Sequence, residues 1–185
     1  MTRKELNDLL RYEQSGYQKA LGCSMMKARL LGEPLYHIWK WQKASRLCDY
    51  YAASKTGPLA SLMAACLRRI ANRRARRVGF DISTLHIGRG LLIYHPGATV
   101  INGGCRIGTD FHLHGNNCLG NLGEGRLECP TIGNGVTLGV GAKVLGGITL
   151  DDQTVVGAGA VVLHSFGPNS RVGGIPAREL PTKKS

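Results

Sequence analysis

Branched aliphatic residues recur every six residues through the second half of the chain. The most regular stretch begins at residue 132 and reads IGNGVT LGVGAK VLGGIT LDDQTV VGAGAV. Such a short, fixed period is typical of a solenoid, in which each unit supplies one short strand and one tight turn. We expect one aliphatic side chain per unit to point inward, with neighbouring coils about 4.8 Å apart. The repeated positions are Ile87, Ile93, Val100, Ile107, Leu113, Leu119, Ile132, Leu138, Val144, Leu150, Val156 and Val162.

Two irregularities interrupt this period. The steps from Ile93 to Val100 and from Val100 to Ile107 are seven residues long, which predicts a local disturbance of the coil. The stretch NLGEGRLECPT, at about 121–131, breaks the repeat altogether. An excursion from a solenoid is usually a loop on one face, and such loops commonly carry function. The alternative is a disordered bulge without a role.

The first half of the chain has a helical pattern instead. Apolar residues recur at three- and four-residue steps across 3–21, 33–55 and 57–79, and glycine or proline separates these stretches. Pro34 and Pro58 occupy first-turn positions, where the missing N–H of proline costs no hydrogen bond.

Charge and glycine content divide the chain at the same place. Residues 1–80 hold 16 of the 24 Lys and Arg and 5 of the 12 Asp and Glu, whereas 81–185 hold 8 and 7. Of the 26 glycines, 5 fall in the first part and 21 in the second. We therefore predict a basic, helical N-terminal region at 1–80 and a mainly β domain at 81–185 that ends in a C-terminal tail.

Six arginines lie between Arg68 and Arg77, in the last predicted helix. One interpretation is a solvated helix face that also holds a neighbouring subunit. Another is attraction to an anionic membrane surface or to ligands that carry phosphate. We do not expect nucleic acid as a partner, because no recognition motif or aromatic stacking platform accompanies the basic run.

The composition predicts a globular protein of the cytoplasm. The hydrophobic fraction of 43% permits a core, and no apolar run approaches the roughly 20 residues that span a bilayer. The polar start, MTRKELNDLLRYEQ, lacks a signal-peptide segment. The six cysteines form no C-x-x-C pair, so we expect reduced thiols and no zinc cluster.

One histidine, His95, lies between two short hydrophobic segments in GLLIYHPGATVINGG. The motif I-G-R-G at 87–90, this histidine, the V-I pair at 100–101 and the closing G-x-P-A-R at 174–178 resemble the catalytic domain of the serine acetyltransferases. They also resemble the relatives of these enzymes in bacterial surface-polysaccharide gene clusters. The resemblance covers about 100 residues. It implies a left-handed parallel β-helix with three hexapeptides per turn, an exception to the right-handed crossover rule.

The resemblance also implies a reaction, the direct transfer of an acetyl group from acetyl-CoA to a hydroxyl. His95 would act as the general base, and no metal is required. Imidazole titrates near neutral pH, and general base catalysis typically contributes about 10² to 10⁴ in rate. Asp81 lies near the position of the carboxylate that orients the base in this family, although its spacing from His95 is one residue shorter.

The family binds acetyl-CoA in the groove between adjacent β-helices of a trimer, so we expect a homotrimer or a dimer of trimers. The pantetheine arm needs backbone partners and little side-chain bulk, and a cation would meet a CoA phosphate. The matching positions are Gly120, Val140 and Ala158 for the arm, and Pro176, Ala177 and Arg178 for the phosphate end.

Three positions depart from the serine-specific pattern. Serine acetyltransferases have an acidic residue before the catalytic histidine and an Arg-His pair before a later proline, whereas this chain has Tyr94, Glu128 and Cys129. Glu128 would repel a substrate carboxylate unless Arg126 compensates. Tyr94 beside the base and a carboxylate across the groove suit a sugar hydroxyl, so we expect a sugar or another small-molecule acceptor, with free serine as the alternative. His114 is a further candidate for contact with the acceptor.

Two other interpretations compete with this one. His112 and His114 would face the same side of a strand, as zinc ligands can, but the β-helix carbonic anhydrases need three histidines at a spacing that is absent here. The other is a catalytically silent trimeric β-helix that binds an anionic surface. Finally, the ending LPTKKS lacks the terminal isoleucine with which serine acetyltransferases dock onto cysteine synthase, so we do not expect that partner.

Overall fold

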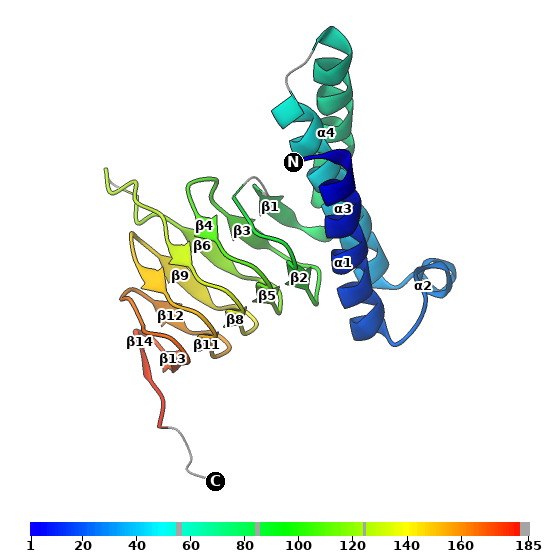
Figure 1. Ribbon diagram of the computed structural model, residues 1–185. Helices are drawn as coiled ribbons and strands as arrows, with labels where there is room; N and C mark the ends of the chain where they lie inside the picture. The colour runs from blue at the N-terminus through cyan, green and yellow to red at the C-terminus, as the bar shows by residue number, and fades with distance from the viewer. Residues whose placement is uncertain (55–56, 84–85, 124, 182–185) are drawn as a thin grey trace. The chain divides into compact units, whose positions relative to one another are not determined.

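A computed structural model describes residues 1–54, 57–83, 86–123 and 125–181 of the chain. It divides after Phe80 into two compact units, the first helical and the second built of short strands (Figure 1). The helical unit covers the basic part of the sequence, and the strand unit covers the hexapeptide repeats.

Three of the helices in the first unit match the predicted stretches to within one residue at each end. Pro34 and Pro58 begin two of them, as predicted. The sequence pattern did not predict the short second helix, because only Ala28 of its seven residues is buried and no apolar period marks it. The helices are α1 (Arg3–Leu21), α2 (Met25–Leu31), α3 (Pro34–Ser54) and α4 (Pro58–Val78).

The long helix α3 packs against both α1 and α4. A buried ion pair joins α3 to α1, with Arg46 Nη2 2.7 Å from Glu13 Oε1. Nearby, the Tyr17 hydroxyl donates to the Gln42 side-chain oxygen at 2.8 Å. Buried polar groups are costly unless they are paired, so these two contacts specify how α1 docks. Across the described residues, no helix has the combination of length and apolar content that a membrane crossing needs.

The second unit is a three-sided coil of parallel strands. Where the repeat is regular, facing residues are 18 apart in sequence, as in the pairs 132/150, 138/156 and 144/162, so three hexapeptides make one coil as predicted. Face A holds β1 (Phe80–Ile82), β3 (Thr99–Ile101), β6 (Cys118–Gly120), β9 (Lys143–Leu145) and β12 (Val161–Val162). Face B holds β4 (Arg106–Ile107), β7 (Thr131–Ile132) and β10 (Thr149–Leu150). Face C holds β2 (Leu92–Ile93), β5 (His112–Leu113), β8 (Thr137–Leu138), β11 (Val155–Val156), β13 (Arg171–Gly174) and β14 (Ala177–Glu179), of which the last pair is antiparallel.

The repeated aliphatic side chains fill the interior of the coil. On face C, Ile93, Leu113, Leu138 and Val156 follow one another in register, and none is more than 1% exposed. Burying one such side chain contributes roughly 1.5–3 kcal/mol, so this column is a main source of the unit's stability.

The prediction that Val100 fills the interior is wrong. Its side chain is 40% exposed, whereas the neighbouring Ile101 is 3% exposed. The inner series therefore steps eight residues from Ile93 to Ile101 and then six to the next inner residue, in place of two seven-residue steps. Because side chains alternate across a strand, an error of one residue exchanges the inner and outer positions. All of the extra length lies in the corner that contains His95.

The predicted excursion at 121–131 is the loop between β6 and β7, which projects from the coils (Figure 1). Leu119 and Val144 face each other although they are 25 residues apart, so the loop adds seven residues to one coil. A short antiparallel bridge between Gly123 and Arg126 orders part of it.

Candidate active site

The candidate base, His95, lies at the corner where the chain turns from face C to face A. It follows β2 by two residues, and its side chain is exposed. This corner contains two residues more than a regular hexapeptide corner, so the chain has room to bow outward at His95.

One residue of each later coil aligns with His95 along the same corner. The strand register of face C, continued two residues beyond the inner aliphatic positions, sets this alignment. We call the aligned residues the corner row, which consists of His95, Gly115, Val140, Ala158 and Gly174.

Hydrogen bonds between successive corners support this alignment. The Gly141 N–H donates to the Gly115 carbonyl at 2.9 Å, and the Gly159 N–H donates to the Val140 carbonyl at 2.8 Å. These bonds link the corners of Gly115, Val140 and Ala158, so this part of the corner row follows the axis of the coil.

Packing is close at the first step of the corner row, between His95 and Gly115. A Cβ at Gly115 would lie 3.1 Å from the His95 carbonyl oxygen and 3.2 Å from the His95 Cβ, and the φ angle of Gly115 is +101°. Space and backbone conformation both require glycine here. Asn117, which is fully buried, accepts from the Gly115 N–H at 3.0 Å and donates to the Gly139 carbonyl at 2.8 Å. This buried amide holds two neighbouring corners in place.

The β13–β14 hairpin closes the C-terminal end of the corner row. In its antiparallel register Gly174 faces Ala177, and the next pair contains Arg178. Pro176 and Arg178 are exposed, and Ala177 is buried between them. The residues of the later coils and of the hairpin that were predicted to contact acetyl-CoA therefore lie along the corner that carries the candidate base.

Three rings gather beside His95 on face C. Tyr94 stacks on His114, with ring centroids 4.6 Å apart, and meets His112 edge-on at 6.0 Å. Burial lowers the pKa of His114, and the nearby His95 lowers it further. Burial also lowers the pKa of His112, although the Asp110 carboxylate opposes this shift. Both rings are therefore held toward the neutral form.

Asp81 lies in β1 on face A, and its side chain is exposed. In the part of the chain that the structure describes, no hydrogen bond or ion pair joins its carboxylate to His95. The pairing of these two residues stays a prediction.

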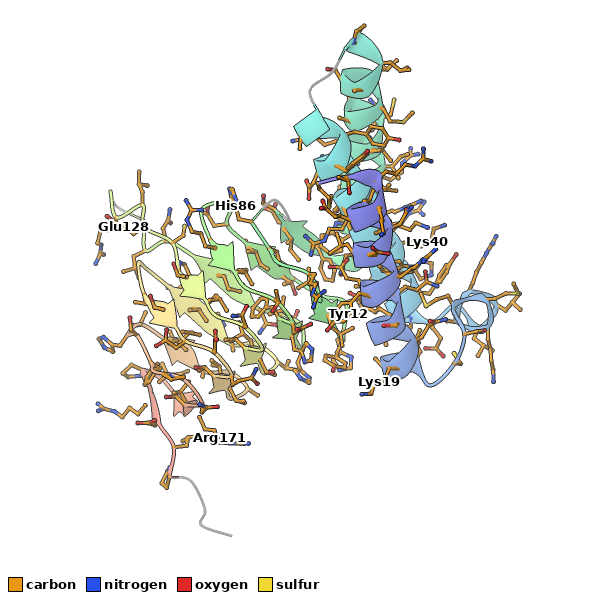
Figure 2. All side chains as sticks on the ribbon, in the orientation of Figure 1. Tyr12, Lys19, Lys40, His86, Glu128 and Arg171 are labelled. Carbon is orange, nitrogen blue, oxygen red and sulfur yellow. The ribbon has the colours of Figure 1, made fainter. Side chains whose placement is uncertain are left out.

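Gly120, Glu128 and Cys129 lie at a different corner, where face A turns to face B. Gly120 ends β6, and Glu128 is exposed on the loop before β7 (Figure 2). Cys129 lies beside Cys105, whose pKa rises to about 12, mainly because it is buried and then because of the neighbouring Cys129 thiol. A single chain therefore divides the predicted site residues between two corners.

Comparison with known proteins gives relatives with named activities, although no family model matches the chain. WcaB of Escherichia coli K12, named for acetyl transfer in colanic acid biosynthesis, is 44% identical over 101 residues, which is 54% of this chain and 62% of WcaB. A serine acetyltransferase of Mycobacterium tuberculosis is 32% identical over 151 residues, or 80% of this chain and 58% of the relative. The chain is similar to these acetyltransferases, and it spans less than two thirds of the length of either relative.

Comparison with a solved structure shows that the similarity includes the fold. The soybean serine acetyltransferase apoenzyme is 28% identical, with a TM-score of 0.75 over 95% of this chain and 69% of the soybean chain. The β-helix is left-handed and preceded by helices, which confirms the predicted fold class.

The sequence pattern missed two residues that shape the candidate site around His95. His112 was considered only as a zinc ligand, although its alternation with His114 indicates that both side chains lie on one side of the strand. Asn117 belongs to no repeat position that marks it as buried. Among the described residues, no group of three or more His, Cys, Asp or Glu side chains is arranged to hold a metal ion.

Proposed function

We propose that this protein moves the acetyl group of acetyl-CoA to a hydroxyl of a sugar acceptor, with His95 as the general base. The observation that carries the proposal is the corner row, which aligns the candidate base with the residues expected to contact the acetyl donor. The names of both relatives, which are acetyltransferases, support the same reaction class.

The corner row supplies a path along which acetyl-CoA, the acetyl donor, can bind. From His95 to Ala158 it crosses three coil steps, about 14 Å at the usual strand spacing. Val140 is 45% exposed and Ala158 is also exposed, so an extended pantetheine arm can reach backbone groups along the row. Arg178, at the far end, offers a planar guanidinium to a phosphate. We therefore place the thioester beside His95 and the phosphates toward Arg178.

In this arrangement His95 takes the proton of the acceptor hydroxyl while the hydroxyl oxygen attacks the thioester carbonyl carbon. A C–O bond forms, the C–S bond breaks, and the leaving CoA thiolate receives the proton from the imidazolium. The products are an acetyl ester and CoA, and the base is restored. Because His114 is held toward the neutral form, it does not oppose the positive charge that develops on His95.

The surroundings of His95 favour a sugar over an amino acid. The half-buried rings of Tyr94 and His114 combine apolar faces with polar edges, as a sugar ring does. At the other corner, Glu128 accepts hydrogen bonds from hydroxyls but repels the carboxylate of an amino acid.

Free serine is the second candidate acceptor. The relatives from Mycobacterium tuberculosis and soybean are named serine acetyltransferases. Arg126 lies two residues before Glu128 on the same loop and would supply a cation for the substrate carboxylate. Efficient acetylation of serine would overturn the preference for a sugar.

We further propose that the active form is a trimer, because one chain separates His95 from Glu128 and Cys129. If a neighbouring chain packed against face A, the corner with His95 in one chain would lie beside the corner with Glu128 and Cys129 in the next. The exposed side chain of Val100 on face A supports such an interface. Light scattering should give three times the 19.9 kDa of one chain, or six times for a dimer of trimers. A monomer at micromolar concentration would overturn this assembly.

Peripheral contact of α4 with an anionic membrane is a separate proposal. The helix contains no acidic residue and exposes Leu59 and Leu62 near its start and Arg69, Arg73 and Arg76 further along. Apolar side chains together with cations favour anionic lipid surfaces. The protein should sediment with vesicles that contain phosphatidylglycerol and stay in solution with phosphatidylcholine alone. Equal recovery with both lipids would contradict the proposal.

A thiol-release assay tests the proposed reaction. The purified protein is incubated with acetyl-CoA and serine, simple sugars or nucleotide sugars, and mass spectrometry identifies the acetylated product. We expect release with a sugar, and a loss of at least about 10² in rate for His95→Ala with an unchanged circular dichroism spectrum. Wild-type turnover by His95→Ala would contradict the mechanism.

A catalytically silent scaffold is the alternative from another class. Acetyl-CoA at a concentration of 100 Kd should stabilise an enzyme by about 2.7 kcal/mol and raise its melting temperature, but should leave a scaffold unchanged. This measurement needs no knowledge of the acceptor.

A further inference from the structure

Cationic side chains from three helices converge on a hollow of about 250 Å³ within the helical unit. Lys40 of α3, which is labelled in Figure 2, is one of the residues that line it. We call the site the basic hollow, and its polar lining consists of Arg29 of α2, Tyr36, His37 and Lys40 of α3, and Arg74 and Arg77 of α4.

Two contacts hold the wall of the basic hollow. Arg74 Nη1 donates to the Lys40 carbonyl at 2.7 Å, which ties α4 to α3. The Lys40 ammonium lies 5.6 Å from the centroid of the Tyr36 ring, within cation–π range. Because these contacts leave N–H groups of Arg74 and Lys40 unused, the same side chains can also bind a ligand.

The lining of the basic hollow contains no carboxylate. Within the described residues, none of Arg29, Lys40, Arg74 and Arg77 forms a salt bridge. Four permanent positive charges around one small space repel one another, and this repulsion is relieved when an anion enters.

Helix dipoles explain only part of this arrangement. Arg29 lies in the last turn of α2, and Arg77 lies in the last turn of α4, where cations are favoured. Each helix end contributes about half a negative charge. Together they offset about one of the four permanent charges, so the hollow keeps a strong positive potential.

We propose that the basic hollow binds a diphosphate group. A volume of 250 Å³ corresponds to roughly eight water molecules and lies below the roughly 300–1,000 Å³ of sites that enclose drug-sized ligands. The space suits a small anion with several oxygens, and arginine forks bind phosphate oxygens in pairs. This site lies wholly in the helical unit and does not depend on the proposed acetyl transfer.

Calorimetry with inorganic pyrophosphate, in buffer without acetyl-CoA, tests the proposal. Arg29→Gln with Lys40→Gln removes two lining charges and should weaken binding about tenfold for each residue. The matched control is Arg73→Gln with Arg76→Gln, which removes the same charge from a part of α4 outside the basic hollow and should change the affinity by less than about threefold. Equal weakening by both pairs, or no binding by the wild type, would overturn the proposal.

Two further measurements keep the result interpretable. Circular dichroism and melting temperature establish that each variant is folded. Lys40→Arg keeps the positive charge and should bind pyrophosphate as tightly as the wild type. Vesicles that contain diacylglycerol diphosphate, a lipid with a diphosphate headgroup, distinguish the source of the phosphate. If Arg29→Gln with Lys40→Gln lowers vesicle binding, the ligand is a lipid headgroup, whereas unchanged vesicle binding together with lost pyrophosphate binding indicates a free anion. Failure of the site would leave thiol release by the enzyme unaffected, so it is separable from failure of the proposed function.

Discussion

Tyr94 stacks on His114 across adjacent coils, with ring centroids 4.6 Å apart and ring planes 17° apart. The two residues are neighbours in the register of face C, so their separation reflects the ordinary strand spacing of about 4.8 Å. The stack fixes the orientation of the Tyr94 ring immediately before His95. Tyr94, one of the three residues that depart from the serine-specific pattern, is therefore part of an ordered surface beside the candidate base.

Replacing Tyr94 should raise the KM of the acceptor and leave the KM of acetyl-CoA unchanged. An aromatic pair is worth about 0.5–1.5 kcal/mol, so Tyr94→Ala should raise the acceptor KM roughly two- to tenfold. Steady-state kinetics with both substrates varied will measure this effect. The matched variant Tyr94→Phe keeps the stack and should stay near the wild-type KM. An increase confined to the KM of acetyl-CoA would count against the assignment.

The paired histidines should make stability depend on pH. Burial lowers the pKa of both His112 and His114 from the ordinary value of 6.5. Below about pH 6.5 the unfolded chain therefore binds more protons at these positions than the folded chain does. The free energy of unfolding should be highest above this pH and should fall as the pH drops toward 5.

Chemical denaturation from pH 5 to 8 will measure this dependence. His112→Gln combined with His114→Gln should flatten the slope, whereas His164→Gln, at an exposed position, should leave it unchanged. An unaltered slope in the double variant would place the pH dependence elsewhere.

Gly115→Ala should disturb the base from one coil away. The new Cβ would press on the His95 backbone, and φ of +101° strains any other residue by roughly 1–3 kcal/mol. We expect a lower melting temperature and a reduced turnover number. Gly123→Ala is the control, because it also has positive φ but no atom lies within 4 Å of its new Cβ. Equal loss of turnover in both variants would mean that backbone strain alone is responsible.

Val100 and Ile101 provide a direct test of strand phase. Ile101→Ala removes a buried side chain and should cost about 2–5 kcal/mol of unfolding free energy. Val100→Ala changes an exposed position and should stay within about 0.5 kcal/mol in a monomeric denaturation experiment. The reverse order would show that the inner series steps by seven residues after all.

Arg178 should act on the phosphate end of the donor. Arg178→Gln should raise the KM of acetyl-CoA about tenfold, as expected for one charge-assisted hydrogen bond. Acetyl-pantetheine lacks the nucleotide phosphates, so wild type and variant should use it equally well. A similar loss with both donors would place Arg178 outside the phosphate contact.

The period of six predicted the coil because each unit buries one aliphatic side chain, and that requirement is local to the unit. The helical stretches were predicted from local spacing too, since apolar residues recur at three- and four-residue steps in α1, α3 and α4. The period could not assign Val100, because a corner with two additional residues shifts the phase of the strand that follows. It also could not mark Asn117, whose partners are backbone groups of its own corner and of the next coil.

The sequence by itself determined the two-part organisation, the solenoid and the candidate base, since composition, spacing and motif are all properties of the chain in order. Only the tertiary structure decided which of these residues meet. His95, Val140 and Ala158 share a corner because successive coils stack in register, although the chain separates them by up to 63 residues. The antiparallel β13–β14 hairpin then places Arg178 opposite Gly173, at the end of this row. The basic hollow arises in the same way, from side chains of three helices that become neighbours only when the helices pack.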